Sequence, residues 1–187
     1  MKRDRETIPF IPSIDATVSD ETRLEAVRAT GMLDQPASAV FDELIVKASA
    51  TLKAPITMIT LVDEYRDYLV AQLGLPEPMA IKGEITNAPS FCQLTVTQDQ
   101  PLAITDAQAM PIFQIFPSVS TAGVRAHLGI PLRFRGQPVG NCCVIDFRPR
   151  VWTEAEIAVL TELAEDVMRH IETIAAKNER SHVVDVS

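Results

Sequence analysis

The stretch from Gly123 to Arg150, GVRAHLGIPLRFRGQPVGNCCVIDFRPR, predicts two β-strands that fold back on each other across one turn. In its first half, apolar side chains alternate with polar or small ones. The apolar set is Ala126, Leu128, Ile130, Leu132 and Phe134. A period of two residues is typical of a strand with one buried face. Arg125 and His127 fall between the apolar positions, so both are expected on the opposite face of the sheet.

The second half of this stretch predicts a strand in the middle of the sheet. Residues 135–138 (RGQP) have the composition of a turn. Residues 139–147 are apolar or small on both faces, apart from Asn141 and Asp146. A strand without polar alternation is typical of one that is covered on both sides.

Length, composition and charge exclude several classes of protein. The chain has 187 residues, 47% of them apolar and 22% charged, which predicts one soluble domain with one core. A formal net charge of −8 repels phosphate backbones, so we expect no nucleic-acid partner. No apolar run approaches the ~20 residues that span a bilayer, so no membrane partner is expected either. Three cysteines and an N-terminus without the apolar core of a secretory signal favour the cytoplasm.

We divide the chain into three parts by its hydrophobic periodicity. Residues 1–18 are predicted to be an extended N-terminal arm, 19–177 a single domain, and 178–187 a flexible tail. The elements expected within the domain are helices at 19–31, 38–52 and from Ser90 onward, strands at 55–62, 67–73 and 101–104, and loops at 75–89 and 111–122. Long loops commonly form the walls of binding sites.

The last helix has a clear start and a long apolar seam. Thr153 and Glu156 form a capping box, and the helical pattern continues to about Lys177. Its apolar residues recur at spacings of three and four: Ile157, Leu160, Ala164, Val167, Ile171 and Ile174. This heptad spacing is longer than one sheet usually covers, so we expect the later turns to meet a partner helix in a homodimer.

Five motifs, taken in their order, resemble the GAF domain. They are LVDExR at 61–66, SFC at 90–92, PLAITDA at 101–107, GIPL at 129–132 and GNCCVIDxRPR at 140–150. The resemblance covers about residues 20–177 and is closest to the GAF modules at the front of bacterial sensor histidine kinases and diguanylate cyclases.

This resemblance implies an α+β, PAS-related fold and a signalling role. It implies an antiparallel sheet of five or six strands, with the first, second and last helices on one face. Short helices and loops would close a pocket on the other face. It also implies dimerisation through helices. The sequence departs from typical relatives at Tyr68-Leu69-Val70 and at Arg125-Ala126-His127-Leu128, so its pocket chemistry is expected to differ.

The residues that we expect at the pocket come from six segments of the chain. They are Tyr68, Phe91, Cys92, Asp106, Phe113, Phe116, Arg125, His127 and Cys142. His127 is a candidate ligand contact, a haem ligand or a polar residue at the sheet surface. Arg125 is suited to an anionic ligand or to an ion pair with Asp106 or Asp146. The aromatic residues would form an apolar wall or fill the pocket.

The three cysteines, Cys92, Cys142 and Cys143, allow a redox interpretation or a purely structural one. Cysteine is among the most buried residue types, and adjacent residues on a strand point to opposite faces, which disfavours a disulfide between Cys142 and Cys143. Free methionine sulfoxide reductases of this fold use several cysteines, in a spacing unlike this one. Relatives that bind a bilin attach it through a cysteine usually followed by histidine, and here Cys92 precedes Gln93.

The leading hypothesis is a non-catalytic sensory module that binds an unidentified small molecule and signals to a downstream protein. Neither a metal site nor a haem or bilin cofactor is expected. The two alternatives are a degenerate domain retained only for dimerisation, and a cysteine-based redox enzyme or thiol sensor.

Overall fold

The centre of the molecule is an antiparallel sheet in the order β3-β2-β1-β6-β5-β4. The computed structural model describes residues 11–86 and 89–184. The six strands of this part of the chain are β1 (Ile56–Val62), β2 (Arg66–Leu73), β3 (Glu84–Thr86), β4 (Leu102–Ile104), β5 (Ala126–Phe134) and β6 (Gln137–Asp146). The two strands predicted from residues 123–150 are β5 and β6, paired from Ala126 and Asp146 to Phe134 and Gln137. The predicted fold class, α+β with an antiparallel sheet, is confirmed.

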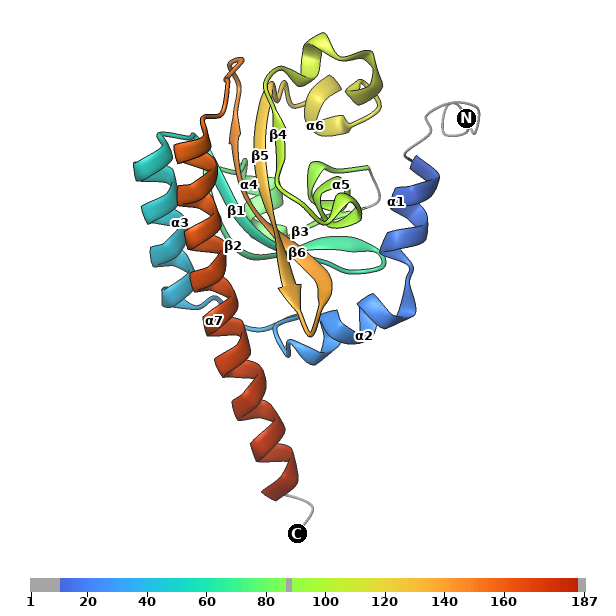
Figure 1. The fold of residues 1–187 in the computed structure, drawn as a ribbon, viewed down its shortest axis with the longest axis vertical. Coiled ribbons are helices and arrows are strands. Elements are labelled where there is room, and N and C mark those ends of the chain that lie inside the picture. Colours follow the sequence, from blue (N-terminus) through green and yellow to red (C-terminus); the bar gives the residue numbers. More distant parts are fainter. Residues whose placement is uncertain (1–10, 87–88, 185–187) are drawn as a thin grey trace.

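One face of the sheet is covered by three helices, as the sequence predicted. They are α2 (Glu21–Ala29), α3 (Ala39–Leu52) and α7 (Glu154–Val184), and Figure 1 shows α3 beside α7. Alternate residues of β5, from Ala126 to Phe134, pack with these helices in one apolar cluster. We call this side the helix-covered face.

The other face carries shorter helices and irregular chain. Helix α5 (Phe91–Gln98) lies over β5 and β6, and α1 (Ile11–Val18) packs against α5. The remaining short elements are α4 (Glu77–Lys82), the 3-10 turns η1 (Ala107–Ala109) and η2 (Pro111–Phe113), and α6 (Pro117–Ser120). A second apolar cluster joins α1, α5, η1, η2 and α6 to the sheet. We call this side the pocket face.

Helix starts follow the capping residues that the sequence shows. The Asp20 carboxylate accepts a hydrogen bond from the backbone N–H of Arg23 at 2.8 Å, and the Ser90 hydroxyl accepts one from that of Gln93 at 3.0 Å. At the start of α7, Glu156 accepts from the Thr153 N–H at 2.8 Å while Thr153 accepts from the Glu156 N–H at 3.2 Å. The predicted capping box is therefore present.

Both predicted ends of the domain need correction. Residues 11–18 form helix α1 rather than an extended arm, because Ile14 and Val18 bury their side chains in the cluster of the pocket face. Helix α7 continues through Val184, so residues 178–184 are helical rather than a flexible tail. Figure 1 shows the end of α7 running past the sheet. Residues 1–10 and 185–187 lie outside the described residues.

The predicted loop at 75–89 also contains regular structure. Glu77–Lys82 form α4, which has Pro76 at its N-terminal boundary and Gly83 in the left-handed region, with φ of 69°, at its C-terminal boundary. Glu84–Thr86 form β3, which pairs with β2. The prolines and glycines of this segment predicted a loop, whereas the structure contains the short helix α4 and the edge strand β3.

The six seam residues of the last helix pack against their own domain. Leu160, Ala164, Val167 and Ile171 are buried in the cluster of the helix-covered face, and Ile157 and Ile174 are half-buried at its edge. The expectation that this seam meets a partner helix is therefore wrong, because the sheet and α3 already cover it.

Candidate functional site

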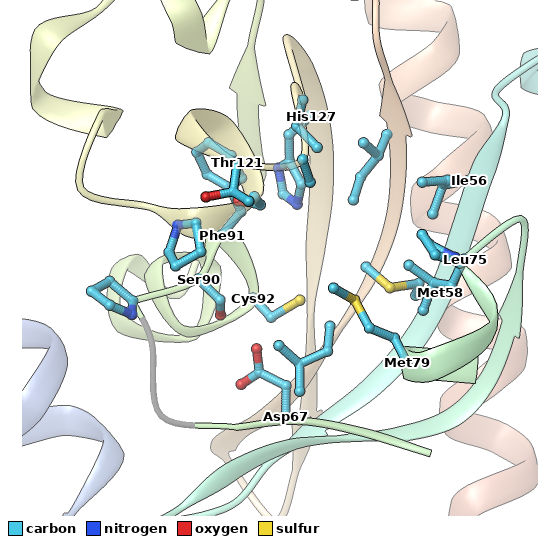
Figure 2. A pocket seen from close by; sticks show the side chains of 18 of the residues that line it. Ile56, Met58, Asp67, Leu75, Met79, Ser90, Phe91, Cys92, Thr121 and His127 are labelled. Carbon is cyan, nitrogen blue, oxygen red and sulfur yellow. The ribbon is translucent and has the colours of Figure 1, made fainter. Parts of the chain in front are cut away.

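A cavity of about 310 Å³ lies on the pocket face of the sheet, beside the start of α5. Figure 2 shows its side chains converging from the sheet and from the elements around it. Strands β1, β2, β5 and β6 contribute Ile56, Met58, Asp67, His127 and Ile145. The chain between β2 and the start of α5 contributes Leu75, Pro76, Met79, Ile85, Pro89 and Ser90. Phe91 and Cys92 come from α5, and Pro117, Ser118, Thr121, Ala122, Val124 and Phe147 from the segments around α6 and after β6.

The start of α5 explains why two of these residues face the cavity. Ser90 caps the helix, which fixes the direction of its first turn. Phe91 and Cys92 follow at once and are both buried. Gly129 on β5 lets α5 approach closely, since an added Cβ there would lie 2.8 Å from the Thr95 hydroxyl and 2.6 Å from the His127 ring. The pocket wall thus depends on a glycine in the neighbouring strand.

His127 is a buried, neutral histidine at one end of the cavity. Its exposed fraction is 0%, and among the described residues neither ring nitrogen meets a hydrogen-bonding partner. The ring stacks on that of Phe91 with centroids 4.9 Å apart. Desolvation lowers the pKa of His127 to about 3, and the nearby backbone of Leu102 offsets only part of this effect. At neutral pH the imidazole therefore offers the cavity one donor and one acceptor without a charge.

Asp67 supplies a buried carboxyl group at another part of the cavity. It is 1% exposed, and neither oxygen has a partner at hydrogen-bonding distance and angle in the described chain. Figure 2 shows it below Ser90 and Cys92. Burial raises the pKa of Asp67 to about 6, although Ser90 and Gln93 lie near enough to favour the ionised form in part.

Sequence reasoning missed Asp67, although a signal for it existed. The acidic residue stands two positions before Leu69, so the period of a strand puts both side chains on the same face. Leu69 is buried in the cluster of the pocket face. A carboxyl group aligned with an apolar face is unusual enough to mark a candidate site.

Three of the nine predicted pocket residues line the cavity, namely Phe91, Cys92 and His127. Phe113 and Phe116 lie behind Phe91, with ring centroids 5.2 and 5.0 Å from it. They support the wall from outside and leave the cavity open, so they do not fill it.

Arg125 and Asp106 pair with each other outside the cavity. The Arg125 Nε donates to Asp106 at 2.9 Å, and a second guanidinium nitrogen bonds the other carboxylate oxygen. The guanidinium lowers the pKa of Asp106. The ion pair that the sequence allowed is present, and neither residue is among those that line the cavity.

Tyr68 and Cys142 lie on the helix-covered face, because each stands one position from a residue that faces the pocket. The Tyr68 hydroxyl donates to the Gln35 carbonyl at 3.0 Å. Cys142 is buried in the cluster of the three covering helices, and burial raises its pKa to about 12. Placing these two residues at the pocket was therefore wrong.

The remaining cysteines meet on the pocket face. Cys92 lines the cavity, and Cys143 on β6 is buried in the same cluster. A hydrogen bond with Cys92 and burial raise the pKa of Cys143 well above its usual value. The raised pKa disfavours, at Cys143, the thiolate that nucleophilic chemistry requires. Within the described residues, no group of three or more His, Cys, Asp or Glu side chains is arranged to hold a metal ion.

Comparison with known proteins identifies the family. The family model described as "GAF domain" matches residues 36–171 of this chain. The chain belongs to the GAF domain family. The resemblance deduced from the sequence motifs is thereby confirmed, and the pocket described above is the cavity of a GAF domain.

The relatives of this GAF domain include signalling and regulatory proteins. The chain is 30% identical over 165 residues to a cyclic di-GMP phosphodiesterase of Pseudomonas aeruginosa. This match covers 85% of the chain but only 27% of the phosphodiesterase. The chain is also 28% identical over 123 residues to a protein of the phosphoenolpyruvate-dependent phosphotransferase system of Escherichia coli. That match covers 65% of the chain and 16% of the E. coli protein. The matched region therefore spans 27% and 16% of the length of these two relatives.

The fold is shared with solved GAF domains. The GAF domain of a phosphoenolpyruvate-protein phosphotransferase from Coxiella burnetii matches with a TM-score of 0.63 and 20% identity, over 84% of this chain and 96% of that domain. At this level of identity the likeness shows the fold alone. Among the described helices, none combines the length and apolar character needed to cross a bilayer.

Proposed function

We propose that this GAF domain is a non-catalytic sensory module whose pocket binds a small molecule. The proposal rests on a cavity that combines apolar walls with buried polar groups for which the described residues supply no hydrogen bond of good geometry. His127 and Asp67 both line the cavity, and both lack a hydrogen-bonding partner among the described residues. An unpaired buried polar group costs free energy. A ligand that pairs with these groups would recover that cost.

The size and shape of the site support a metabolite rather than a large cofactor. A volume of about 310 Å³ is at the lower end of small-molecule pockets. At the ~30 Å³ that a water occupies in the liquid, it has room for roughly ten non-hydrogen atoms. A haem or bilin is a tetrapyrrole and would need a far larger space.

The proposed route of signalling runs through β5 to the last helix. His127 faces the pocket, whereas its neighbours Ala126 and Leu128 pack in the cluster that contains α7. A ligand that favours one position of β5 would therefore favour one position of α7. We propose that a homodimer and a downstream signalling protein in the cytoplasm read this position through the end of α7 or a face other than the buried seam.

The two alternative functions have weaker support. A dimerisation scaffold without a ligand would require a filled pocket, and Phe113 and Phe116 leave it open. A thiol enzyme would require an accessible thiolate. Burial raises the pKa of Cys142, and a hydrogen bond with Cys92 together with burial raises that of Cys143.

Helix α4 provides a matched pair of variants to test the proposal. Met79 lines the pocket and is 38% exposed, so Met79→Trp narrows the pocket from its rim without disturbing the core. Ile81 on the same helix is 82% exposed and is not among the lining residues, so Ile81→Trp is the control.

A library of small metabolites is then screened by thermal shift and native mass spectrometry. A ligand at one hundred times its Kd stabilises by about 2.7 kcal/mol, which raises Tm by roughly 5–10 °C for a domain of this size. The proposal expects such compounds to act on the unmodified protein and on Ile81→Trp, and to lose their effect on Met79→Trp. If no compound binds, or if Met79→Trp responds as the control does, the pocket is not a sensing site.

A further inference from the structure

Asp67 gives the pocket a chemical preference beyond its size. Its carboxyl group is buried, lines the cavity and has no hydrogen-bonding partner among the described residues. We propose that the pocket selects small apolar ligands that carry a protonated nitrogen, an amine or an amidine, and that this nitrogen pairs with Asp67. This inference rests on the proposed sensing function and narrows it to one class of ligand.

The fold does not use Asp67 as a structural ion pair. The basic residue with an electrostatic influence on it is Arg23 on α2. All three hydrogen bonds of that guanidinium go to backbone carbonyls, to Thr17 at 2.9 Å, Val18 at 2.7 Å and Val62 at 2.7 Å. Among the described residues, Arg23 and Asp67 form neither an ion pair nor a hydrogen bond with each other. Arg23 therefore lies close enough to favour ionisation of Asp67 but does not occupy its oxygens.

The rest of the lining argues against an anionic ligand. The described residues that line the cavity include no lysine and no arginine, so Asp67 is the charged group that a ligand would meet. His127 is neutral at physiological pH, because burial lowers its pKa to about 3. A phosphate or carboxylate would enter without a cation to pair with and would be repelled by the carboxylate. Nucleotides and phosphorylated metabolites are therefore disfavoured.

The apolar walls define the other half of the ligand. Ile56 and Met58 on β1 and Ile145 on β6 form the sheet side, and Phe91 closes the opposite side. Figure 2 shows the Met58 and Met79 side chains facing the cavity beside Leu75. Thioethers and aliphatic groups adapt to different shapes, so this wall fits an aromatic or branched apolar group. A primary amine on such a group would place its ammonium against Asp67.

Three probes of nearly equal size but different charge show whether the pocket prefers a cation, apart from whether it binds a ligand of this size at all. They are 2-phenylethylamine, which is a cation, 2-phenylethanol, which is neutral, and phenylacetate, which is an anion. Dissociation constants are measured by isothermal titration calorimetry and by NMR titration at pH 7.5, where both the amine and Asp67 are in their charged forms. The protein is the full chain.

We expect 2-phenylethylamine to bind at least tenfold more tightly than 2-phenylethanol, and phenylacetate to bind most weakly. Asp67→Asn keeps the shape and should remove the preference, so that the amine and the alcohol bind within about threefold of each other. Glu64→Gln is the control, because Glu64 is exposed in the turn between β1 and β2 and should leave the preference intact. Circular dichroism verifies that each variant is folded.

The outcomes distinguish this inference from the function on which it rests. If the alcohol binds to the unmodified protein as tightly as the amine, the charge preference is refuted while the ligand pocket stands. This comparison uses the unmodified protein alone, so it is valid even if Asp67→Asn fails to fold. If none of the three probes binds or shifts the pocket resonances, the preference for an apolar amine is refuted, whereas the proposed ligand site is decided by the metabolite screen on Met79→Trp and Ile81→Trp.

Discussion

The ring of His127 stacks on the ring of Phe91, with centroids 4.9 Å apart and an angle of 25° between their planes. The contact joins β5 to the first residue of α5, and it holds a histidine that is fully buried and neutral. A protonated imidazole in this place would lack a hydrogen-bonding partner among the described residues. The stack therefore couples the packing of the pocket wall to pH.

Replacing His127 by Gln should make the protein less sensitive to acid. The unfolded chain binds a proton at this histidine below a pKa of about 6.5, whereas the folded protein does so only near 3. Between these values the unfolded state holds more protons, so stability is lost as pH falls, by about 1.4 kcal/mol per pH unit. His127→Gln should remove most of this slope between pH 6 and 4. Urea unfolding at several pH values measures it, and an unchanged slope would contradict a buried neutral histidine.

Replacing Asp67 by Asn should change the pH dependence of the unfolding free energy in the direction opposite to His127→Gln. Here the folded pKa, about 6, lies above the ordinary 3.8, so the folded state holds more protons between these values. Stability contributed by this group is therefore lost as pH rises from about 4 to 6. The charged or titratable groups near Asp67 are Arg23 from α2, Cys92 from α5 and Cys143 from β6.

In the unmodified protein the effects of Asp67 and His127 nearly cancel between pH 4 and 6. In Asp67→Asn only the effect of His127 remains. Between pH 6 and 4 the unfolding free energy of this variant should therefore fall with acidification by up to ~1.4 kcal/mol per pH unit more than that of the unmodified protein. At pH 7 the variant should be more stable by about 1–3 kcal/mol, since the asparagine avoids the cost of a buried charge. Equal slopes for the variant and the unmodified protein would show that Asp67 is not buried as described.

Arg23 should be a large contributor to stability although it lies on a short helix. Its exposed fraction is 1%, and it bonds the carbonyls of Thr17, Val18 and Val62, which ties α1 and α2 to the end of β1. Lysine cannot reproduce three bonds of fixed direction. Arg23→Lys should therefore cost about 2–4 kcal/mol of unfolding free energy.

Arg28→Lys on the same helix is the matched control for Arg23→Lys. Arg28 pairs with Glu21 at the surface, where its side chain is 54% exposed, and the change should alter stability by less than about 0.5 kcal/mol. Hydrogen exchange should show faster opening of α1 only in Arg23→Lys. Equal effects of the two variants would refute the role of the three backbone contacts.

The thiols should differ in reactivity according to the face of the sheet. Cys92 lines the cavity, whereas Cys142 is enclosed by the covering helices and has its pKa raised to about 12 by burial. Methyl methanethiosulfonate is small enough to enter the cavity, so it should modify Cys92 at least tenfold faster than Cys142. Peptide mass spectrometry measures both rates, and Met79→Trp should slow only the reaction at Cys92. Comparable rates at the two thiols would mean that the cavity gives no access.

The order of elements could be predicted from the sequence wherever the signal was local. Alternation from Ala126 to Phe134 predicted β5, and the pair Thr153 and Glu156 predicted the start of α7, since both patterns depend on neighbouring residues. The proline-rich segment before Ser90 concealed α4 and β3, because their formation depends on packing and on pairing with β2.

The candidate site was only partly predictable, for a related reason. Phe91, Cys92 and His127 were identified because they stand next to a cap or within a regular strand. Tyr68 and Cys142 were assigned to the wrong face, since the face that a strand presents to the pocket is fixed by register with its neighbours.

The sequence by itself determined most of the individual strands and helices, because periodicity and capping depend on adjacent residues. Five motifs in their order indicated the GAF family, and that resemblance implied the antiparallel sheet and the helices that cover one face. Only the tertiary structure decided what the pocket contains. The register of β1 and β2 brings Asp67 opposite Val62 and under the start of α5, and that of β5 and β6 buries His127 beside Ile145. Likewise, only the tertiary structure shows that the apolar seam of α7 packs against the sheet of its own domain. Contacts between residues far apart in the chain leave no local pattern, so they had to be seen in three dimensions.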